Sequence, residues 1–245
     1  MILFQVNRAR SLVALALTVA CAPSGTSNQG TETTTVSRPL PATVAAPAAP
    51  DAAAPAPPQD SNITRADLAR IQGNTDAPVW VIVVSDFQCP YCKQWHHETY
   101  PALRDEFVKT GKVRVAYVNF PLAQHAQAWP SAEAAMCAGA QGKFWQMHDA
   151  IFRTQEKWAS APSPAVVFDS LARSTGVDLA RWRQCVESGV MKPLIQADHD
   201  RARSAGAQST PSFLIGDQIL AGAHPIDGFR RAIDSALVKS GKPKS

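Results

Sequence analysis

The chain has 245 residues, of which 45% are hydrophobic and 18% are charged, and its formal net charge is +4 at pH 7. This composition excludes a protein that is disordered throughout, because the apolar content is sufficient for one sizeable domain. The small positive excess is too dilute to indicate a nucleic-acid-binding protein. The five cysteines are too few for a small domain that is built around disulfides.

The first 21 residues have the order of charged and apolar side chains that is typical of an export signal. Arg8 and Arg10 precede an apolar run over residues 12–20. This run is shorter than the roughly 20 apolar residues that a membrane-spanning helix needs. We therefore expect an exported protein, either periplasmic or held in the cell envelope.

The end of this signal leaves two outcomes open for Cys21. Residues 18–21 are similar to a bacterial lipoprotein box, in which Cys21 would carry a lipid anchor, although Thr18 stands where leucine is usual. Alternatively, cleavage at small residues would discard the cysteine.

Residues 22–62 consist mainly of Thr, Ser, Ala and Pro, with almost no large apolar side chain. Such a segment cannot bury enough apolar surface to offset the entropy of ordering. We expect a disordered spacer here, followed by a folded domain over residues 63–245.

The first half of this domain has the pattern of a β-α-β unit. The β-branched run over residues 79–84 predicts a central strand that is buried on both faces. Residues 90–109 predict a helix with a kink at Pro101, and the alternation over residues 113–118 predicts a second strand. Because a helix connects them, the two strands should be parallel.

The second half combines a helical insertion with a β-β-α unit. Strand signals are lost over residues 121–206, where apolar side chains recur at helical spacing. Strands are predicted again over residues 212–215 and 218–220, joined by a two-residue turn, and a closing amphipathic helix follows. The predicted fold class is α/β.

The Cys89-Pro90-Tyr91-Cys92 motif comes directly after the first strand. A C-x-x-C pair can be half of a metal site, but a structural zinc site needs four ligands. No second pair at suitable spacing completes the set, although a nearby histidine could add one ligand. A redox dithiol explains more, and we expect no metal or other cofactor.

A position at the start of the helix would make Cys89 reactive. Unpaired N–H groups and the helix dipole stabilise a thiolate there, and Pro90 at the next position sacrifices no hydrogen bond. Cys92 lies one turn further and should be more deeply buried. Its thiol would resolve the mixed disulfide formed at Cys89. Three basic side chains of the same helix follow the motif and could add positive charge near it: Lys93, His96 and His97. In such positions, basic residues more commonly lie on the solvent-exposed face of the helix.

Three segments together resemble the DsbA-like branch of the thioredoxin superfamily. They are Asp-Phe-Gln-Cys-Pro-Tyr-Cys over residues 86–92, Gln-Gly-Lys-Phe-Trp over residues 141–145 and Ser-Thr-Pro-Ser-Phe over residues 209–213. The resemblance covers about residues 70–240. It implies a thioredoxin-like fold, β-α-β then β-β-α, with an inserted helical subdomain.

The resemblance also implies how a substrate would bind. The Thr210–Pro211 peptide bond should be cis, which would place the Thr210 backbone beside the sulfurs, where it pairs with an extended substrate strand. Pro90 and Tyr91 would complete the substrate-binding surface. The implied partners are reduced or unfolded exported proteins and a membrane protein, linked to quinones, that restores the active-site disulfide.

Two departures from related proteins affect the expected chemistry. Val83 stands where related oxidases carry a buried acid, six residues before the nucleophilic cysteine, and Asp86 lies three residues before it. The simpler interpretation is that Asp86 only ends the strand. Pro90-Tyr91 also differs from the Pro-His of the strongest oxidases, so the potential could be milder.

Cys137 and Cys185 could be two small buried apolar residues. In an exported protein with four cysteines in its domain, we instead predict that they form a structural disulfide. The remaining histidines have no partner at informative spacing, and we expect structural roles for them; these are His125, His148, His199 and His224.

The sequence most favours an exported thiol-disulfide oxidoreductase that introduces disulfides into other exported proteins through Cys89 and Cys92. A reductase or isomerase is the first alternative, because the same couple can work in either direction. A non-catalytic peptide-binding or chaperone module of the same fold is the second.

Overall fold

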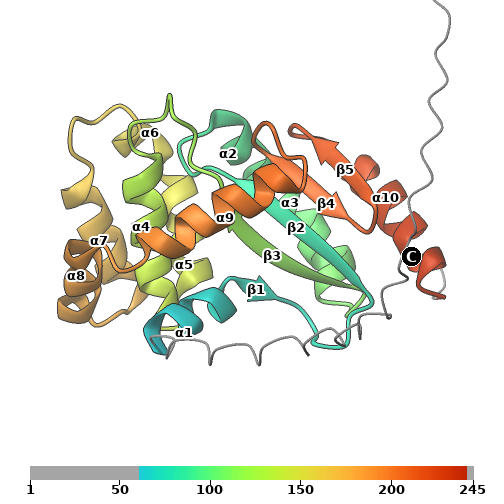
Figure 1. The fold of residues 1–245 in the computed structure, drawn as a ribbon, viewed down its shortest axis with the longest axis horizontal. Coiled ribbons are helices and arrows are strands. Elements are labelled where there is room, and N and C mark those ends of the chain that lie inside the picture. The colour runs from blue at the N-terminus through green and yellow to red at the C-terminus, as the bar shows by residue number, and fades with distance from the viewer. Residues whose placement is uncertain (1–60, 242–245) are drawn as a thin grey trace, which may run out of the picture. The chain divides into compact units, whose positions relative to one another are not determined.

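The computed structural model describes residues 61–241, and at its centre is one five-stranded sheet in the order β1-β3-β2-β4-β5 (Figure 1). The strands are β1 (Ile71–Gln72), β2 (Val79–Ser85), β3 (Val113–Asn119), β4 (Ser212–Ile215) and β5 (Gln218–Ala221). The pair β2 and β3 is parallel, and the other neighbouring pairs are antiparallel. The predicted α/β class and β-α-β unit are confirmed.

The connection from β2 to β3 is helical but interrupted. It consists of α2 (Pro90–Glu98), α3 (Tyr100–Leu103) and the π-helical turn η1 (Arg104–Val108). The break falls at Thr99, with Pro101 in the first turn of α3, as the predicted kink requires. Gly111 then takes a left-handed conformation (φ 77°), which ends the helical segment and allows the chain to enter β3.

The strand β2 is central in the sheet, but the first residues of the strand are buried on one face only. Val81 and Val83 are buried, whereas Trp80 is 38% exposed. The Arg114 guanidinium, on the adjacent strand, lies 4.4 Å from the centre of the Trp80 ring. The prediction of burial on both faces was therefore wrong at this end, because a cation covers the ring where no helix does.

The segment between β3 and β4 consists of helices joined by loops and contains no strand, as predicted for residues 121–206. Its helices are α4 (Ala128–Gly139), α5 (Phe144–Arg153), α6 (Gln155–Trp158), α7 (Ala165–Thr175), α8 (Leu179–Ser188) and α9 (Lys192–Ser204). Figure 1 shows α4 to α8 gathered beyond one end of the sheet and α9 returning across it. Asp178 caps α8 by accepting the Arg181 N–H at 3.0 Å.

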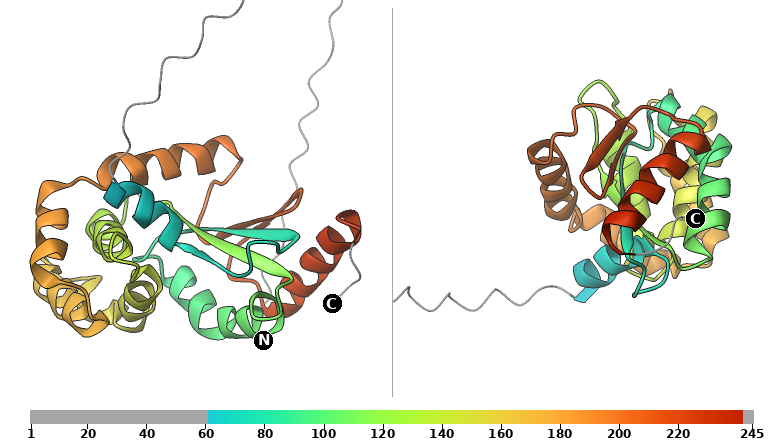
Figure 2. Two further views of the ribbon diagram at one scale, coloured as in Figure 1. Left: turned by 90° about the horizontal axis from the view of Figure 1, so that it is seen from below. Right: turned by 90° about the vertical axis from the view of Figure 1, so that its right-hand side faces the viewer.

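The sheet is covered on both faces, and the views in Figure 2 show these layers. Helix α10 (Ile226–Lys239) packs with α2 and α3 against one face, where Val81, Phe213 and Phe229 meet. On the other face Val84 packs against Ala202 of α9. A second apolar cluster fills the helical insertion and includes both Cys89 and Cys92. The insertion therefore contributes to the packing around the cysteine motif.

The described chain begins with a helix that the sequence analysis did not predict. Helix α1 (Ser61–Ala69) starts two residues before the expected domain boundary at residue 63, so the predicted spacer over residues 22–62 is too long at this end. The helix is fixed by packing, because Ala66 is fully buried and its backbone lies against Gly139 of α4.

The expected export signal, Cys21 and the rest of the spacer lie outside the described residues. Within residues 61–241, no helix combines the length and apolar character that crossing a bilayer requires.

Candidate active site

The turn between β2 and α2 sets the position of Cys89. The Asp86 side chain accepts the Gln88 N–H at 2.8 Å, and the Asp86 carbonyl oxygen accepts the Cys89 N–H at 3.1 Å. Cys89 is the N-cap of α2, with extended backbone angles (φ −67°, ψ 124°), and Pro90 is the first helical residue. The side chain of Cys89 is thereby held at the positive end of the helix, as predicted.

The Cys89 thiol is strongly acidified. The neighbouring Cys92 thiol, as a hydrogen-bond donor, lowers the pKa of Cys89 from its usual value to about 6, against the opposing effect of burial. The Thr210 side chain and the backbone N–H groups of Tyr91 and Cys92 lower this pKa further. The first N–H groups of α2 thus contribute, but the largest contribution comes from the second cysteine of the motif.

Cys92 has the opposite behaviour. It is 1% exposed, against 4% for Cys89, and its burial raises the pKa of its thiol well above the usual value. The hydrogen bond to Cys89 raises this pKa too, because the Cys92 proton is the one that stabilises the Cys89 thiolate. Both sulfurs are unpaired, so the structure presents a dithiol with one acidic and one protonated member.

The loop before β4 closes the site from the other side. The Thr210–Pro211 peptide bond is cis, and the Cys89 Sγ lies 3.5 Å from the Thr210 carbonyl oxygen. The Thr210 hydroxyl is buried and has no hydrogen-bond partner within residues 61–241. Its O–H can therefore turn toward a Cys89 thiolate, which is consistent with the lowering of the Cys89 pKa.

The surface around Cys89 is partly apolar. Tyr91 is 63% exposed, and Pro90 beside it is also exposed. Because the Cys89 sulfur contacts the Thr210 carbonyl oxygen, an extended chain bound along Thr210 would pass this sulfur. Of the four residues predicted to bind substrate, Thr210 contacts the Cys89 sulfur through its carbonyl oxygen, Pro90 and Tyr91 follow Cys89 in the chain, and Pro211 follows Thr210.

Three glutamines that the sequence analysis missed hold the turn before α2. The Gln155 amide, from α6, donates to the carbonyl oxygens of Phe87 at 2.7 Å and of Cys89 at 3.1 Å. Gln88 donates to the Ala159 carbonyl at 2.8 Å and accepts the Gln127 N–H at 2.6 Å; the Gln127 amide donates to the Ala161 carbonyl oxygen. Nothing in a single sequence distinguishes such glutamines from others, because their partners are backbone carbonyls on distant segments.

The histidines of α2 differ in their surroundings. His97 is exposed and Lys93 pairs with Glu156, as a solvated face would predict. The side chain of His96, in contrast, is only 11% exposed and stacks against Phe152 of α5. The expectation of a solvated face was wrong for His96, because the insertion packs over this side of the helix.

Burial, together with the neighbouring His148, lowers the pKa of His96 to about 3, so this residue carries no positive charge near the site at neutral pH. His148 is also buried, which lowers its pKa, and its Nδ1 lies 2.9 Å from the Asp149 carboxylate. Ligand-type atoms of these three residues lie within 4.8 Å of one another. Their aromatic neighbours indicate a packed core cluster, since the rings of His96 and His148 meet edge to face at 4.9 Å.

Asp86 and His125 form a pair that the sequence analysis did not foresee. Asp86 is 2% exposed, and its burial raises the pKa of its carboxyl group. Its Oδ2 accepts the Leu122 N–H at 3.0 Å and lies 2.7 Å from the His125 Nδ1. Asp86 therefore does more than end the strand, and His125 does have a partner, 39 residues away in the sequence.

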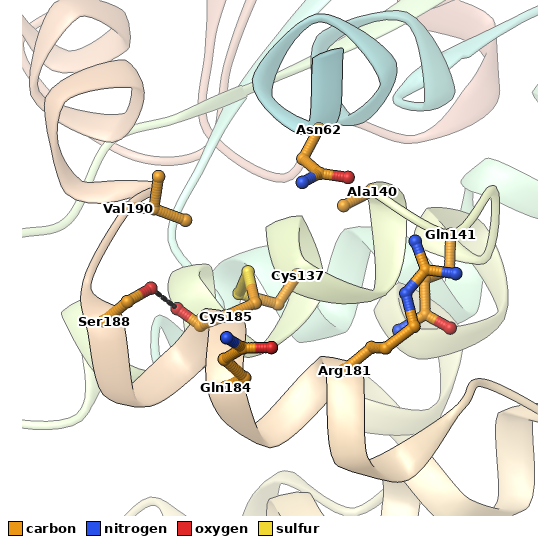
Figure 3. A pocket seen from close by; sticks show the side chains of 9 residues that line it. All are labelled: Asn62, Cys137, Ala140, Gln141, Arg181, Gln184, Cys185, Ser188 and Val190. Atoms are coloured by element: carbon orange, nitrogen blue, oxygen red, sulfur yellow. Dashed lines mark hydrogen bonds between the residues drawn. A yellow bond between two sulfur atoms is a disulfide. The ribbon is translucent and has the colours of Figure 1, made fainter. Parts of the chain in front are cut away.

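Cys137 and Cys185, which the sequence analysis expects to be bonded, form a disulfide between α4 and α8. Figure 3 shows both among the side chains that line a pocket of about 400 Å³. The other lining residues come from α1, from α8 and from the segments that follow α4 and α8, and none belongs to the cysteine motif. The pocket therefore excludes the cysteine motif, although Cys137 packs in the same apolar cluster as Cys89 and Cys92.

Comparison with known proteins shows which family this chain matches. A family model described as Thioredoxin matches residues 66–235, which is more than half of the chain. A Bacillus anthracis protein named as a probable disulfide bond formation protein D is 29% identical over 174 residues, which cover 68% of this chain and 77% of the relative.

Solved structures show the same architecture. Oxidised BdbD from Bacillus subtilis superimposes with a TM-score of 0.63 at 22% identity, covering 69% of this chain and 92% of the other. The alpha-DsbA1 of Wolbachia pipientis superimposes with a TM-score of 0.61 at 20% identity, covering 70% and 92% of the two chains. At these identities the likeness concerns the fold, including the helical insertion.

Proposed function

The chain belongs to the thioredoxin family as a DsbA-like thiol-disulfide oxidoreductase, and from this premise we propose that it introduces disulfides into other exported proteins through Cys89 and Cys92. The observation that carries the proposal is the lowered pKa of Cys89, at about 6, beside the protonated thiol of Cys92. A group that stabilises the thiolate stabilises the reduced protein, so the disulfide form becomes the better oxidant.

The reaction balances as two exchanges. A substrate thiolate attacks the Cys89 sulfur of the Cys89–Cys92 disulfide, and the Cys92 sulfur leaves and takes up a proton. A second substrate thiolate then attacks the substrate sulfur of the mixed disulfide, and Cys89 leaves as a thiolate. Two substrate thiols are oxidised to one disulfide, and the protein gains two electrons. The acidity of Cys89 favours the second step, because a low-pKa thiol is a good leaving group.

Substrate binding is proposed along the segment that contains Thr210 and Pro211. An extended substrate would pair with the Thr210 backbone and lie against Pro90 and Tyr91. The contact of 3.5 Å between the Cys89 Sγ and the Thr210 carbonyl oxygen supports this placement. Recognition through backbone atoms would suit reduced or unfolded proteins of varied sequence.

The setting of the reaction is part of the proposal. The signal pattern over residues 1–21 supports export to the periplasm or cell envelope, with a lipid anchor at Cys21 as one outcome. An oxidase of this kind must be reoxidised after each turnover, and we propose a redox partner in the membrane for this step. The site itself needs no metal or other cofactor for thiol-disulfide exchange.

The equilibrium of the Cys89–Cys92 couple with glutathione tests the direction of the reaction. A midpoint potential near −120 mV, in the range of strong oxidants, would support the oxidase, whereas one near −270 mV, as in thioredoxin, would identify a reductase. A peptide-binding module without turnover is tested by Cys89→Ser. Loss of oxidation of a reduced, unfolded substrate is expected, and full function of this variant would contradict any enzymatic role.

A further inference from the structure

An incoming substrate cysteine has to lose its proton before it can attack the Cys89–Cys92 disulfide. The pKa of an ordinary cysteine is about 8.5, so only a small fraction is ionised at neutral pH. Val83, where related oxidases carry a buried acid, is apolar and buried. A protein group that accepts this proton and speeds the attack would therefore come from another position around the site.

The Asp86–His125 pair has the arrangement of an oriented base. Each oxygen of the Asp86 carboxylate accepts a backbone N–H: Oδ1 that of Gln88 and Oδ2 that of Leu122. Burial raises the pKa of this carboxyl group, and the hydrogen bonds from Leu122, Gln88 and His125 act against that effect. With both oxygens accepting, the His125 Nδ1, 2.7 Å from Oδ2, is assigned the ring hydrogen and donates it. The lone pair of the ring is then on Nε2. A buried carboxylate that fixes one ring nitrogen in this way leaves the other as the base.

The Nε2 atom is available for this role. Within residues 61–241 it has no hydrogen-bond partner, and the side chain of His125 is 18% exposed, so solvent and solutes can reach it. The other histidine close to α2, His96, is packed among aromatic rings instead.

The position of His125 is fixed relative to Cys89. His125 lies on the connection from β3 to α4 (residues 120–127), which Figure 1 shows beside the start of α2. Two contacts attach this connection to the turn before the motif: Leu122 to the Asp86 carboxylate, and Gln127 to Gln88. The same turn is closed by the hydrogen bond from Cys89 to Asp86. A continuous set of hydrogen bonds therefore connects the segment that carries His125 with the turn that carries the reacting sulfur.

We propose that His125 is the general base that accepts the proton of the incoming substrate thiol, with Asp86 as its positioning residue. The inference rests on the proposed function. The proton moves from the substrate sulfur to Nε2, the substrate sulfur bonds to the Cys89 Sγ, and the electron pair of the Cys89–Cys92 bond goes to the Cys92 Sγ. The imidazolium that forms is stabilised by the Asp86 carboxylate and then returns its proton to solvent or to Cys92.

The test compares two substrates in a single turnover of the oxidised full chain. One is a peptide with an ordinary cysteine, and the other is an aromatic thiol that is already ionised at neutral pH. The variant His125→Asn keeps an N–H that can donate to Asp86 but has no basic nitrogen. His97→Asn, on an exposed position of α2, is the matched control.

We expect His125→Asn to slow the reaction with the cysteine peptide by about 10²-fold, the usual contribution of a general base, and to leave the reaction with the aromatic thiol within about twofold. His97→Asn should change neither rate. Equal slowing of both substrates, or slowing of neither, would overturn the proposal. A shift in the titration of Cys89 in His125→Asn would overturn it too, since His125 would then act through the reacting sulfur.

This outcome is separable from failure of the proposed function. If the oxidised wild-type chain reacts with neither thiol, the oxidase is refuted and His125 has no reaction to assist. If His125→Asn fails to fold, His125→Gln provides the same comparison, because its amide can also reach the Asp86 carboxylate and has no basic nitrogen.

Discussion

The two cysteine pairs of this protein occupy different kinds of structure. Cys89 and Cys92 lie two residues apart at the start of α2 and are unpaired. Cys137 and Cys185 lie 48 residues apart on α4 and α8 and are bonded. In the first pair the helix N-terminus and the neighbouring thiol stabilise one anion. In the second pair the bond joins two helices of the insertion, and neither sulfur has such an environment. Local surroundings, more than the cysteines themselves, separate a reactive couple from a cross-link.

The largest expected effect comes from Cys92→Ala. Turnover with a reduced, unfolded substrate should fall by about 10³-fold or more, because the couple no longer exists. The pKa of Cys89 should also rise from about 6, since the Cys92 thiol is the main group that lowers it. Thiolate absorbance of Cys89 measures the second effect. An unchanged titration would show that the helix start alone stabilises the anion.

The double variant Cys137→Ala/Cys185→Ala should affect stability and not turnover. Opening a loop of 48 residues removes up to about 4 kcal/mol from the free energy of unfolding. Urea unfolding of the oxidised protein measures this change, and the rate of substrate oxidation should stay within about twofold. A large change in that rate would contradict this prediction and show that the two pairs are coupled through the apolar cluster that they share.

The stability of the reduced protein should depend on pH because of Cys89. Its folded pKa, about 6, lies below the ordinary value of 9.0, so the stabilisation is complete above about pH 9 and is lost as the pH falls through 6. Between pH 6.5 and 8.5 the free energy of unfolding of the reduced protein should rise, relative to the oxidised protein, by about 1 kcal/mol per pH unit, with an upper limit of about 1.4 kcal/mol per unit. The oxidised protein is the control, because its Cys89 cannot titrate. Parallel pH profiles for the two forms would contradict the assigned pKa.

The smallest expected effect concerns the contact between the insertion and the turn before α2. Gln155→Leu removes the donor to two buried carbonyl oxygens, which should cost about 1–3 kcal/mol of stability. Gln141→Leu is the matched control, because Gln141 also bonds to the backbone, at Asp178, but in an exposed position. Thermal unfolding of both variants provides the comparison. Equal losses would mean that the turn before α2 does not depend on the insertion.

Much of the fold could be predicted from local patterns. The β-branched run that forms β2, the motif at the start of α2 and the turn at Gly216-Asp217 between β4 and β5 are each specified by neighbouring residues. Helix α1 was missed because its apolar face is short: Ile63, Ala66 and Ala69 pack against the apolar cluster of the insertion, and the polar residues around them resemble the preceding spacer. The exposure of Trp80 was missed because burial depends on what covers a strand.

The candidate site divides in the same way. Cys89, Cys92 and the Thr210–Pro211 segment could be identified because the motif and its neighbours carry the chemistry in a few adjacent residues. The Asp86–His125 pair joins segments 39 residues apart, and Gln155 reaches Cys89 from 66 residues away. Such partners depend on how the insertion folds over the sheet, which a single sequence does not specify.

The amide of Gln155 has a consequence for any attempt to transplant this chemistry. It belongs to a four-residue helix of the insertion, yet it holds the two carbonyl groups that fix the direction of the chain as it enters α2. A shortened protein in which residues 121–206 are replaced by a simple linker would retain every strand and the complete Cys-Pro-Tyr-Cys sequence. It would nevertheless lose the hydrogen bonds from Gln155 to the Phe87 and Cys89 carbonyl oxygens. The insertion and the motif therefore have to be transferred together into any new protein.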